Sequence, residues 1–154
     1  MDNNILDKSL DRDNIKKRVL VLCTGNSIRS QMAEGFLKKY RESWLIESAG
    51  TFPVGINPMA VAVMAESGID ISKNSSKSVS RFISSSFDLV ITVCDNARSS
   101  CPVFPGDDTT RYIHWSFEDP SAAPGSYEER LDSFRKTRDL IDGKIKEFLY
   151  TPDI

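Results

Sequence analysis

Residues 18–36 read RVLVLCTGNSIRSQMAEGF and decide the fold. The short apolar run at 19–22 predicts a buried strand of a parallel sheet that ends at Cys23. Small polar turn residues follow, and Met32, Phe36 and Leu37 then recur at helical spacing. A buried strand, a tight turn and an amphipathic helix are the beginning of a βαβ unit.

The rest of the domain repeats this alternation. Further strands are expected over 44–48, 88–93 and 111–115. Asn57 and Pro58 predict the start of a helix that Gly68 caps, a short helix is expected over 78–85, and a long one over 127–149. The fold class is therefore α/β, as a single-domain three-layer sandwich with a four-stranded parallel sheet over residues 18–154. Residues 1–17 are polar and aperiodic, which predicts a flexible extension.

Composition limits the functional classes. The 154 residues suit one domain, and a net charge of −2 gives no reason to expect a nucleic-acid or membrane partner. The N-terminus has no apolar secretion signal, so we expect a cytoplasmic protein. Three cysteines argue against a static disulfide framework, and a single histidine, His114, argues against a zinc site. We expect a monomer with no bound metal.

The anion loop, residues 23–29, has the pattern C-x5-R. A loop of this length can turn its backbone N–H groups towards a tetrahedral oxyanion, and the helix N-terminus adds partial positive charge. Arg29 can hold two oxygens with its planar fork, and the same surroundings favour a nucleophilic thiolate at Cys23. The alternative is a buried thiol at a strand end, but the strand–turn–helix context favours function. The expected oxyanion-binding residues are Thr24, Gly25, Asn26, Ser27, Ile28, Arg29 and Ser30. Among these, Asn26 and the hydroxyls of Ser27 and Ser30 can also orient the loop and the sulfur.

Asp119 precedes Pro120 in the expected loop after the fourth strand. Oxygen that leaves a cysteine adduct needs a proton, which Asp119 can supply as a general acid. The alternative is an ordinary turn aspartate before proline.

Cys94 and Cys101 are separated by six residues. A disulfide across this spacing needs the segment to bend or partly unwind, which suits a movable redox shuttle better than a structural link. The pair alone leaves open that the two cysteines are unrelated.

Three features together resemble one family: CTGNSIRSQMAEG at 23–35, the two further cysteines, and HWSFEDP at 114–120. Residues 18–149 resemble the thioredoxin-coupled arsenate reductases, which share the low-molecular-weight tyrosine phosphatase fold. The resemblance implies that Cys23 attacks arsenate, with phosphate or sulfate as competing oxyanions. Cys94 then attacks Cys23, Cys101 attacks Cys94, and thioredoxin reduces the final disulfide. It implies no bound cofactor.

Some positions depart from the family pattern. Ile28 stands where some relatives carry another cysteine. Asn26, Glu34 and Ser48 match the potassium site of several relatives, but Ser75 and Lys77 do not, so no metal is predicted.

Two other functions remain open. A tyrosine phosphatase would use Cys23, Arg29 and Asp119 and leave the other cysteines idle. Phosphatases of this fold usually have tyrosine after Asp-Pro, whereas Ser121 follows here, which favours the reductase with weak phosphatase activity. The other alternative is a module that binds an oxyanion or senses oxidation without turnover.

Overall fold

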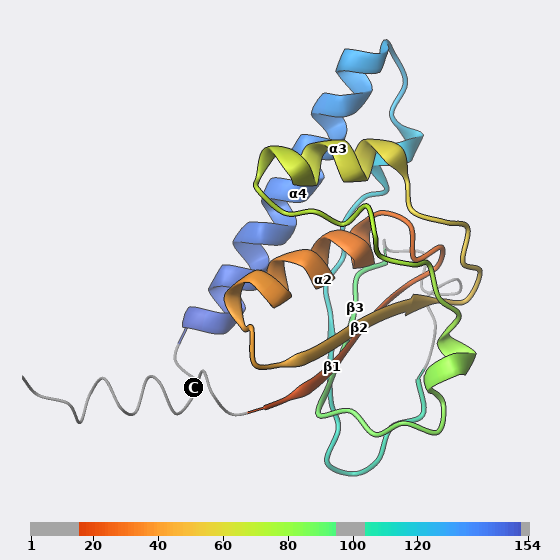
Figure 1. The fold of residues 1–154 in the computed structure, drawn as a ribbon, viewed down its shortest axis with the longest axis vertical. Coiled ribbons are helices and arrows are strands. Elements are labelled where there is room, and N and C mark those ends of the chain that lie inside the picture. The colour runs from red at the N-terminus through yellow and green to blue at the C-terminus, as the bar shows by residue number, and fades with distance from the viewer. Residues whose placement is uncertain (1–15, 95–103, 152–154) are drawn as a thin grey trace, which may run out of the picture.

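The computed structural model describes residues 16–94 and 104–151, and the elements below lie within them. The fold is α/β, as predicted (Figure 1). Four parallel strands lie in the order β2-β1-β3-β4. The strands are β1 (Arg18–Cys23), β2 (Leu45–Gly50), β3 (Leu89–Thr92) and β4 (Arg111–His114). The helices are α2 (Arg29–Tyr40), α3 (Pro58–Glu66) and α4 (Tyr127–Tyr150), with 3-10 turns η1 (Val79–Phe82) and η3 (Pro120–Ala122).

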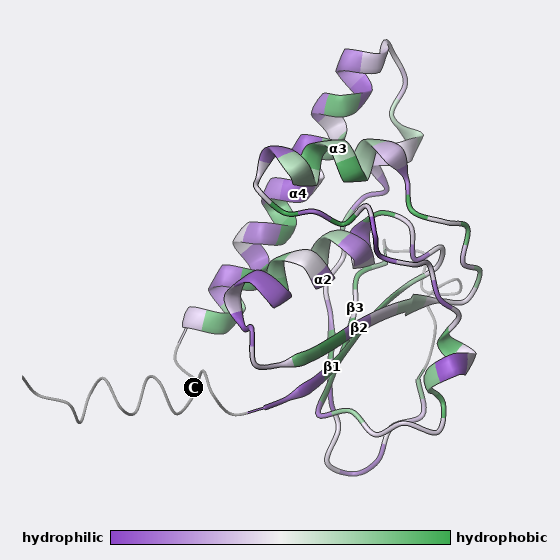
Figure 2. Cartoon of the chain, viewed as in Figure 1, coloured by the Kyte–Doolittle hydropathy of each residue, from purple (hydrophilic) through white to green (hydrophobic). Residues whose placement is uncertain are grey.

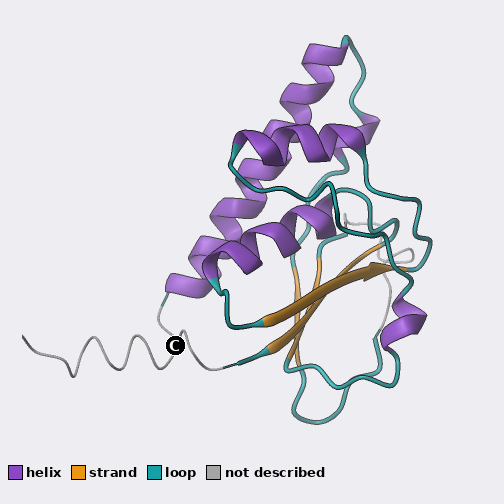
Figure 3. Cartoon of the chain, in the orientation of Figure 1, coloured by secondary structure: helices purple, strands orange, loops and turns teal. Residues whose placement is uncertain are grey.

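The two faces of the sheet are buried in different ways. The helices α2, α3 and α4 gather on one face (Figure 3), where Val19 and Val21 of β1 join the larger core cluster. Leu20 and Leu22 belong to a smaller cluster on the other face. Because successive strand residues point to opposite faces, a strand buried on both sides is apolar throughout. In Figure 2, α4 alternates between green and purple, as expected of a helix with one buried face.

Local sequence signals set the starts of two helices. The Asn57 side chain accepts a hydrogen bond from the Met59 N–H at 2.8 Å, and Pro58 takes the first position of α3. At α4, Ser126 and Glu129 form a capping box, in which each side chain bonds the other's backbone N–H. The predicted starts of both helices are confirmed.

The helix expected over residues 78–85 is much shorter than predicted. The structure has the single turn η1, capped by Ser78, whose hydroxyl accepts a hydrogen bond from the Ser80 N–H at 3.2 Å. Serine hydroxyls compete in this way for backbone groups and weaken helices. The second face of the sheet is therefore covered by η1 and by three aromatic side chains, Phe82, Phe87 and Phe104, that pack edge to face.

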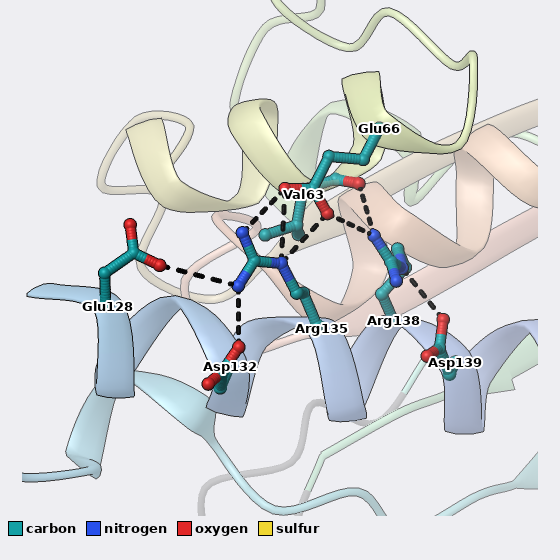
Figure 4. A network of polar contacts seen from close by, with 7 residues as sticks. All are labelled: Val63, Glu66, Glu128, Asp132, Arg135, Arg138 and Asp139. Atoms are coloured by element: carbon teal, nitrogen blue, oxygen red, sulfur yellow. Dashed lines mark hydrogen bonds and ion pairs between the residues drawn. The ribbon is translucent and has the colours of Figure 1, made fainter.

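An ion-pair network joins α3 to α4 at the surface (Figure 4). Glu66 lies 2.8 Å from Arg135 Nη2 and 2.8 Å from Arg138 Nη1. Hydrogen bonds from Arg135, followed by those from Arg138, lower the pKa of Glu66 to about 2. The two helices are thus tied together by charge as well as by apolar contact.

The sheet topology marks one place for a site. From β1 the chain crosses to β2 on one side, and from β3 it crosses to β4 on the other. Ligands of open α/β sheets bind where neighbouring strands diverge in this way, beyond their carboxyl ends. Cys23 ends β1, and Cys94 follows β3 by two residues. Within residues 16–94 and 104–151, no helix has the length and apolar character needed to cross a membrane.

Candidate active site

The carbonyl groups of the anion loop are held by hydrogen bonds from a neighbouring segment. Thr24 O, Gly25 O and Ser27 O accept backbone hydrogen bonds from residues 52–57 at 2.9, 3.1 and 3.1 Å. In a trans peptide the C=O and the following N–H point in opposite directions. The N–H group after each of these carbonyls therefore turns towards the inside of the loop, as an anion cradle requires.

The N-terminus of α2 adds to this cradle. Ile28 occupies the N-cap position, where its apolar side chain cannot accept a hydrogen bond. The first turn, which begins at Arg29, contains no acidic residue. No acidic side chain of the first turn therefore neutralises the partial positive charge of the helix N-terminus, and this charge can stabilise a bound anion.

Asn26 supports the loop from behind. Its backbone is left-handed (φ +46°), a conformation that asparagine tolerates better than most residues. Its Nδ2 donates to Ser30 Oγ and Ser48 Oγ at 2.8 and 2.9 Å, and its Oδ1 accepts from the Lys77 N–H at 2.8 Å. The buried amide thus joins the loop to α2, β2 and the segment of residues 74–77.

Hydrogen bonds converge on the sulfur of Cys23, which is 3% exposed. The Asn26 N–H donates to Cys23 Sγ at 3.2 Å, and Ser30 Oγ lies 2.9 Å from it. A thiolate at Cys23 carries no hydrogen, so in that form the Ser30 hydroxyl, which accepts from Asn26 Nδ2, is the donor to the sulfur. Both donors stabilise a thiolate, which is the nucleophilic form.

Arg29 is tied to the loop that carries Asp119. Its Nη1 donates to the Phe117 carbonyl at 2.9 Å, and its Nη2 lies 3.9 Å from Asp119 Oδ2. Asp119 Oδ1 accepts two hydrogen bonds from Ser121, from the N–H at 2.9 Å and from the hydroxyl at 2.7 Å. The guanidinium and the carboxylate are therefore held on the same side of the site.

A cavity of about 320 Å³ opens above the nucleophile. Six of the predicted residues and Asp119 lie in its wall, together with three that sequence reasoning missed, Val54, Asn57 and Ser121. The lining residues are Cys23, Thr24, Gly25, Ser27, Ile28, Arg29, Val54, Asn57, Asp119 and Ser121. Of the predicted oxyanion-binding residues, Asn26 and Ser30 are not among the lining residues; they hold the loop and the sulfur. Val54 and Asn57 were missed because they are far from the loop in sequence. Asn57 had been predicted only as the start of a helix.

Cys94 and Cys23 follow neighbouring strands, since β1 pairs with β3 and the Val93 N–H donates to the Leu22 carbonyl at 2.9 Å. Cys94 is 1% exposed and belongs to the same cluster of buried side chains as Cys23. The second predicted shuttle residue, Cys101, lies outside the described residues, as does most of the predicted extension.

The positions compared above with a potassium site, both those that match it and those that do not, are engaged with other groups of the protein. Glu34 forms an ion pair with Lys38 and accepts a hydrogen bond from the Ser48 hydroxyl. The Lys77 ammonium lies 3.5 Å from Glu47 and donates to the Ser75 carbonyl at 3.4 Å. Among the described residues, no group of three or more His, Cys, Asp or Glu side chains is arranged to hold a metal ion.

A thiol in a C-x5-R loop, below a cavity at the strand ends of a parallel sheet, is the arrangement that attack on a tetrahedral oxyanion through cysteine requires. Residues 18–152 match the model of the low molecular weight phosphotyrosine protein phosphatase family. The chain belongs to this family.

Its relatives include both reductases and phosphatases. The arsenate reductase of Halalkalibacterium halodurans is 45% identical over 137 residues, which cover 88% of this chain and 97% of that protein. A solved structure described as an arsenate reductase in the phosphate binding state is 31% identical, with a TM-score of 0.73 over 86% of this chain and 96% of the other. The low molecular weight protein tyrosine phosphatase from T. tengcongensis is 28% identical, with a TM-score of 0.70 over 88% and 99%.

Proposed function

We propose that the chain is an arsenate reductase that works in the cytoplasm as a monomer and is regenerated by thioredoxin. The observation that carries the proposal is the burial of Cys94 in the same cluster as Cys23. Hydrolysis of a phosphate ester needs one sulfur, whereas reduction of an oxyanion needs a second thiol to receive the oxidation. Similarity to arsenate reductases over 88% of the chain supports arsenate as the substrate.

The first step forms a bond between sulfur and arsenic. The Cys23 thiolate attacks arsenate, while Arg29 and the loop N–H groups stabilise the negative oxygens. One oxygen leaves as water, and Asp119 donates a proton to it as general acid. The 3.9 Å separation between Asp119 and Arg29 keeps the acid beside the oxygens that the guanidinium binds.

The second step transfers two electrons to arsenic. The Cys94 thiolate attacks the Cys23 sulfur, a disulfide forms, and the electron pair of the sulfur–arsenic bond stays on arsenic, which leaves as arsenite. Cys101 then attacks Cys94, which releases the Cys23 thiolate and moves the disulfide to the 94–101 pair. A thioredoxin dithiol reduces this pair and completes the cycle.

The proposal is tested by supplying arsenate, thioredoxin, thioredoxin reductase and NADPH, and by measuring arsenite and NADPH together. We expect one NADPH oxidised for each arsenite formed, and none with Cys23→Ser. NADPH oxidation that does not respond to arsenate would contradict the proposal.

Cys94→Ser separates the reductase from the phosphatase alternative. Phosphatase chemistry would require Cys23 but not Cys94, so this variant should keep any hydrolysis of p-nitrophenyl phosphate while it loses arsenite release. A wild-type protein that hydrolyses the ester efficiently and forms no arsenite would identify a phosphatase.

A further inference from the structure

Gln31 is a fully buried polar residue in the first turn of α2, outside the cavity wall. Its Nε2 donates to Asn26 O and to Ser75 O, both at 3.2 Å. Its Oε1 accepts a hydrogen bond from Asn74 Nδ2 at 3.1 Å. A side-chain amide has two N–H donors and one carbonyl acceptor, so both donors and the acceptor of Gln31 are used.

The segment of residues 74–77 that Gln31 binds also contacts the anion loop directly. Ser76 Oγ donates to Gly25 O at 3.1 Å, and the Lys77 N–H donates to Asn26 Oδ1 at 2.8 Å. Gln31 therefore ties the back of the loop to the segment that supports it.

The Asn26 carbonyl that Gln31 holds belongs to the left-handed residue of the loop. Because C=O and the next N–H point in opposite directions, fixing this carbonyl also fixes the direction of the Ser27 N–H. Ser27 lines the anion cavity. A contact made behind the loop thus controls a donor at its inner side.

We propose that Gln31 is a positioning residue for oxyanion binding, which acts through Asn26 and residues 74–77 and does not touch the anion. The role rests on the oxyanion-binding part of the proposed function and is independent of the disulfide relay. Gln31→Met keeps the approximate size of the side chain but leaves the buried Asn26 carbonyl and the Asn74 amide without their partner in Gln31. The Ser75 carbonyl loses one of its two donors and keeps the Lys77 ammonium. We expect the affinity for sulfate to fall about tenfold. The lost hydrogen bonds cost the most free energy in the ordered conformation of the loop, which is the conformation that binds the anion.

The experiment measures how sulfate protects Cys23 from iodoacetamide in the reduced full chain, with the modified cysteine identified by peptide mass. The sulfate concentration that halves the rate at Cys23 is compared between variants, and Tm is recorded for each. Ser76→Ala, which removes only the hydroxyl donor to Gly25 O, should raise this concentration about threefold. This second variant changes a part-buried side chain and tests the same support if Gln31→Met does not fold.

Leu37→Ala is the control for general loss of stability. Leu37 is fully buried on the same helix, so its truncation should lower Tm at least as much as Gln31→Met does, without changing sulfate protection. Weaker protection in Gln31→Met and Ser76→Ala, with wild-type protection in Leu37→Ala, supports the role. Unchanged protection in the first two variants, or an equal loss in the control, overturns it. No protection of the wild type by sulfate would overturn the oxyanion site as well.

Discussion

The sulfur of Cys23 and the hydroxyl oxygen of Ser30 lie 2.9 Å apart, and the same hydroxyl oxygen accepts a hydrogen bond from Asn26 Nδ2 at 2.8 Å. Six residues lie between the two positions in sequence, and the turn into α2 brings them together. The loop therefore places hydrogen-bonding groups at the sulfur of the proposed nucleophile.

Ser30→Ala should slow the reaction of Cys23 with iodoacetamide by about tenfold at neutral pH, because one hydrogen bond to the thiolate is lost. Ser27→Ala is the matched control. It removes a serine hydroxyl but keeps the Ser27 backbone carbonyl, which accepts the hydrogen bond that holds the loop at this position. Equal rates in Ser30→Ala and wild type would show that the serine does not activate the sulfur.

Gly50→Ala should disrupt the anion loop. A Cβ at this position would lie 2.4 Å from Thr24 O and 2.9 Å from Asn26 N, and backbone atoms cannot move aside without moving the loop. We expect loss of sulfate protection at Cys23 and a lower Tm. Gly143→Ala should instead keep sulfate protection and should not lower Tm. A Cβ at Gly143 meets nothing within 4 Å, and alanine is more stable than glycine in a helix interior by ~1 kcal/mol. A folded Gly50→Ala that binds sulfate normally would refute the close-approach explanation.

Asp119→Asn should separate catalysis from binding. The amide keeps the shape of the carboxyl group but cannot donate a proton as a general acid, so turnover should fall by about 100-fold while sulfate protection remains. Steady-state arsenite formation and the protection assay are measured on the same preparation. Normal turnover in Asp119→Asn would show that Asp119 is not the general acid and only forms the turn with Ser121.

Glu66→Gln should lower stability in a pH-dependent way. The pKa of Glu66 falls from 4.5 to about 2 on folding, so its contribution is complete above pH 4.5 and disappears as the pH falls towards 2. We expect Tm to drop by about 2 °C at pH 7 and low salt, since surface pairs contribute little, and the difference to shrink below pH 3. Glu128→Gln is the control, because Glu128 is 76% exposed and lies 3.8 Å from Arg135. A difference that is unchanged between pH 7 and pH 2.5 would contradict this explanation.

The sequence predicted the features that depend on neighbouring residues. Cys23 and Arg29 belong to one continuous loop, and the strand before it and the helix after it have clear apolar periods. Asn57 and Pro58 correctly predicted the start of α3 by local capping. The parallel sheet follows from the alternation of these elements.

Features that depend on distant segments were not predictable from pattern alone. Val54 enters the cavity because its segment runs beside the anion loop, and Gln31 forms hydrogen bonds with residues 74–75, which are distant in sequence. Asn26 and Ser30 were expected both to bind the oxyanion and to orient the loop and the sulfur. Their hydrogen bonds fit the second role, and neither residue lines the cavity.

The central claim is that Cys94 receives the oxidation from Cys23, and a trapped intermediate tests it most directly. Cys101→Ser, treated with arsenate without thioredoxin and then acid-quenched and digested, should yield one arsenite per chain and a peptide pair linked by a Cys23–Cys94 disulfide. Cys94→Ser under the same conditions should release no arsenite. Arsenite released by Cys94→Ser, or a Cys101→Ser variant that turns over repeatedly without the linked peptides, would contradict the account.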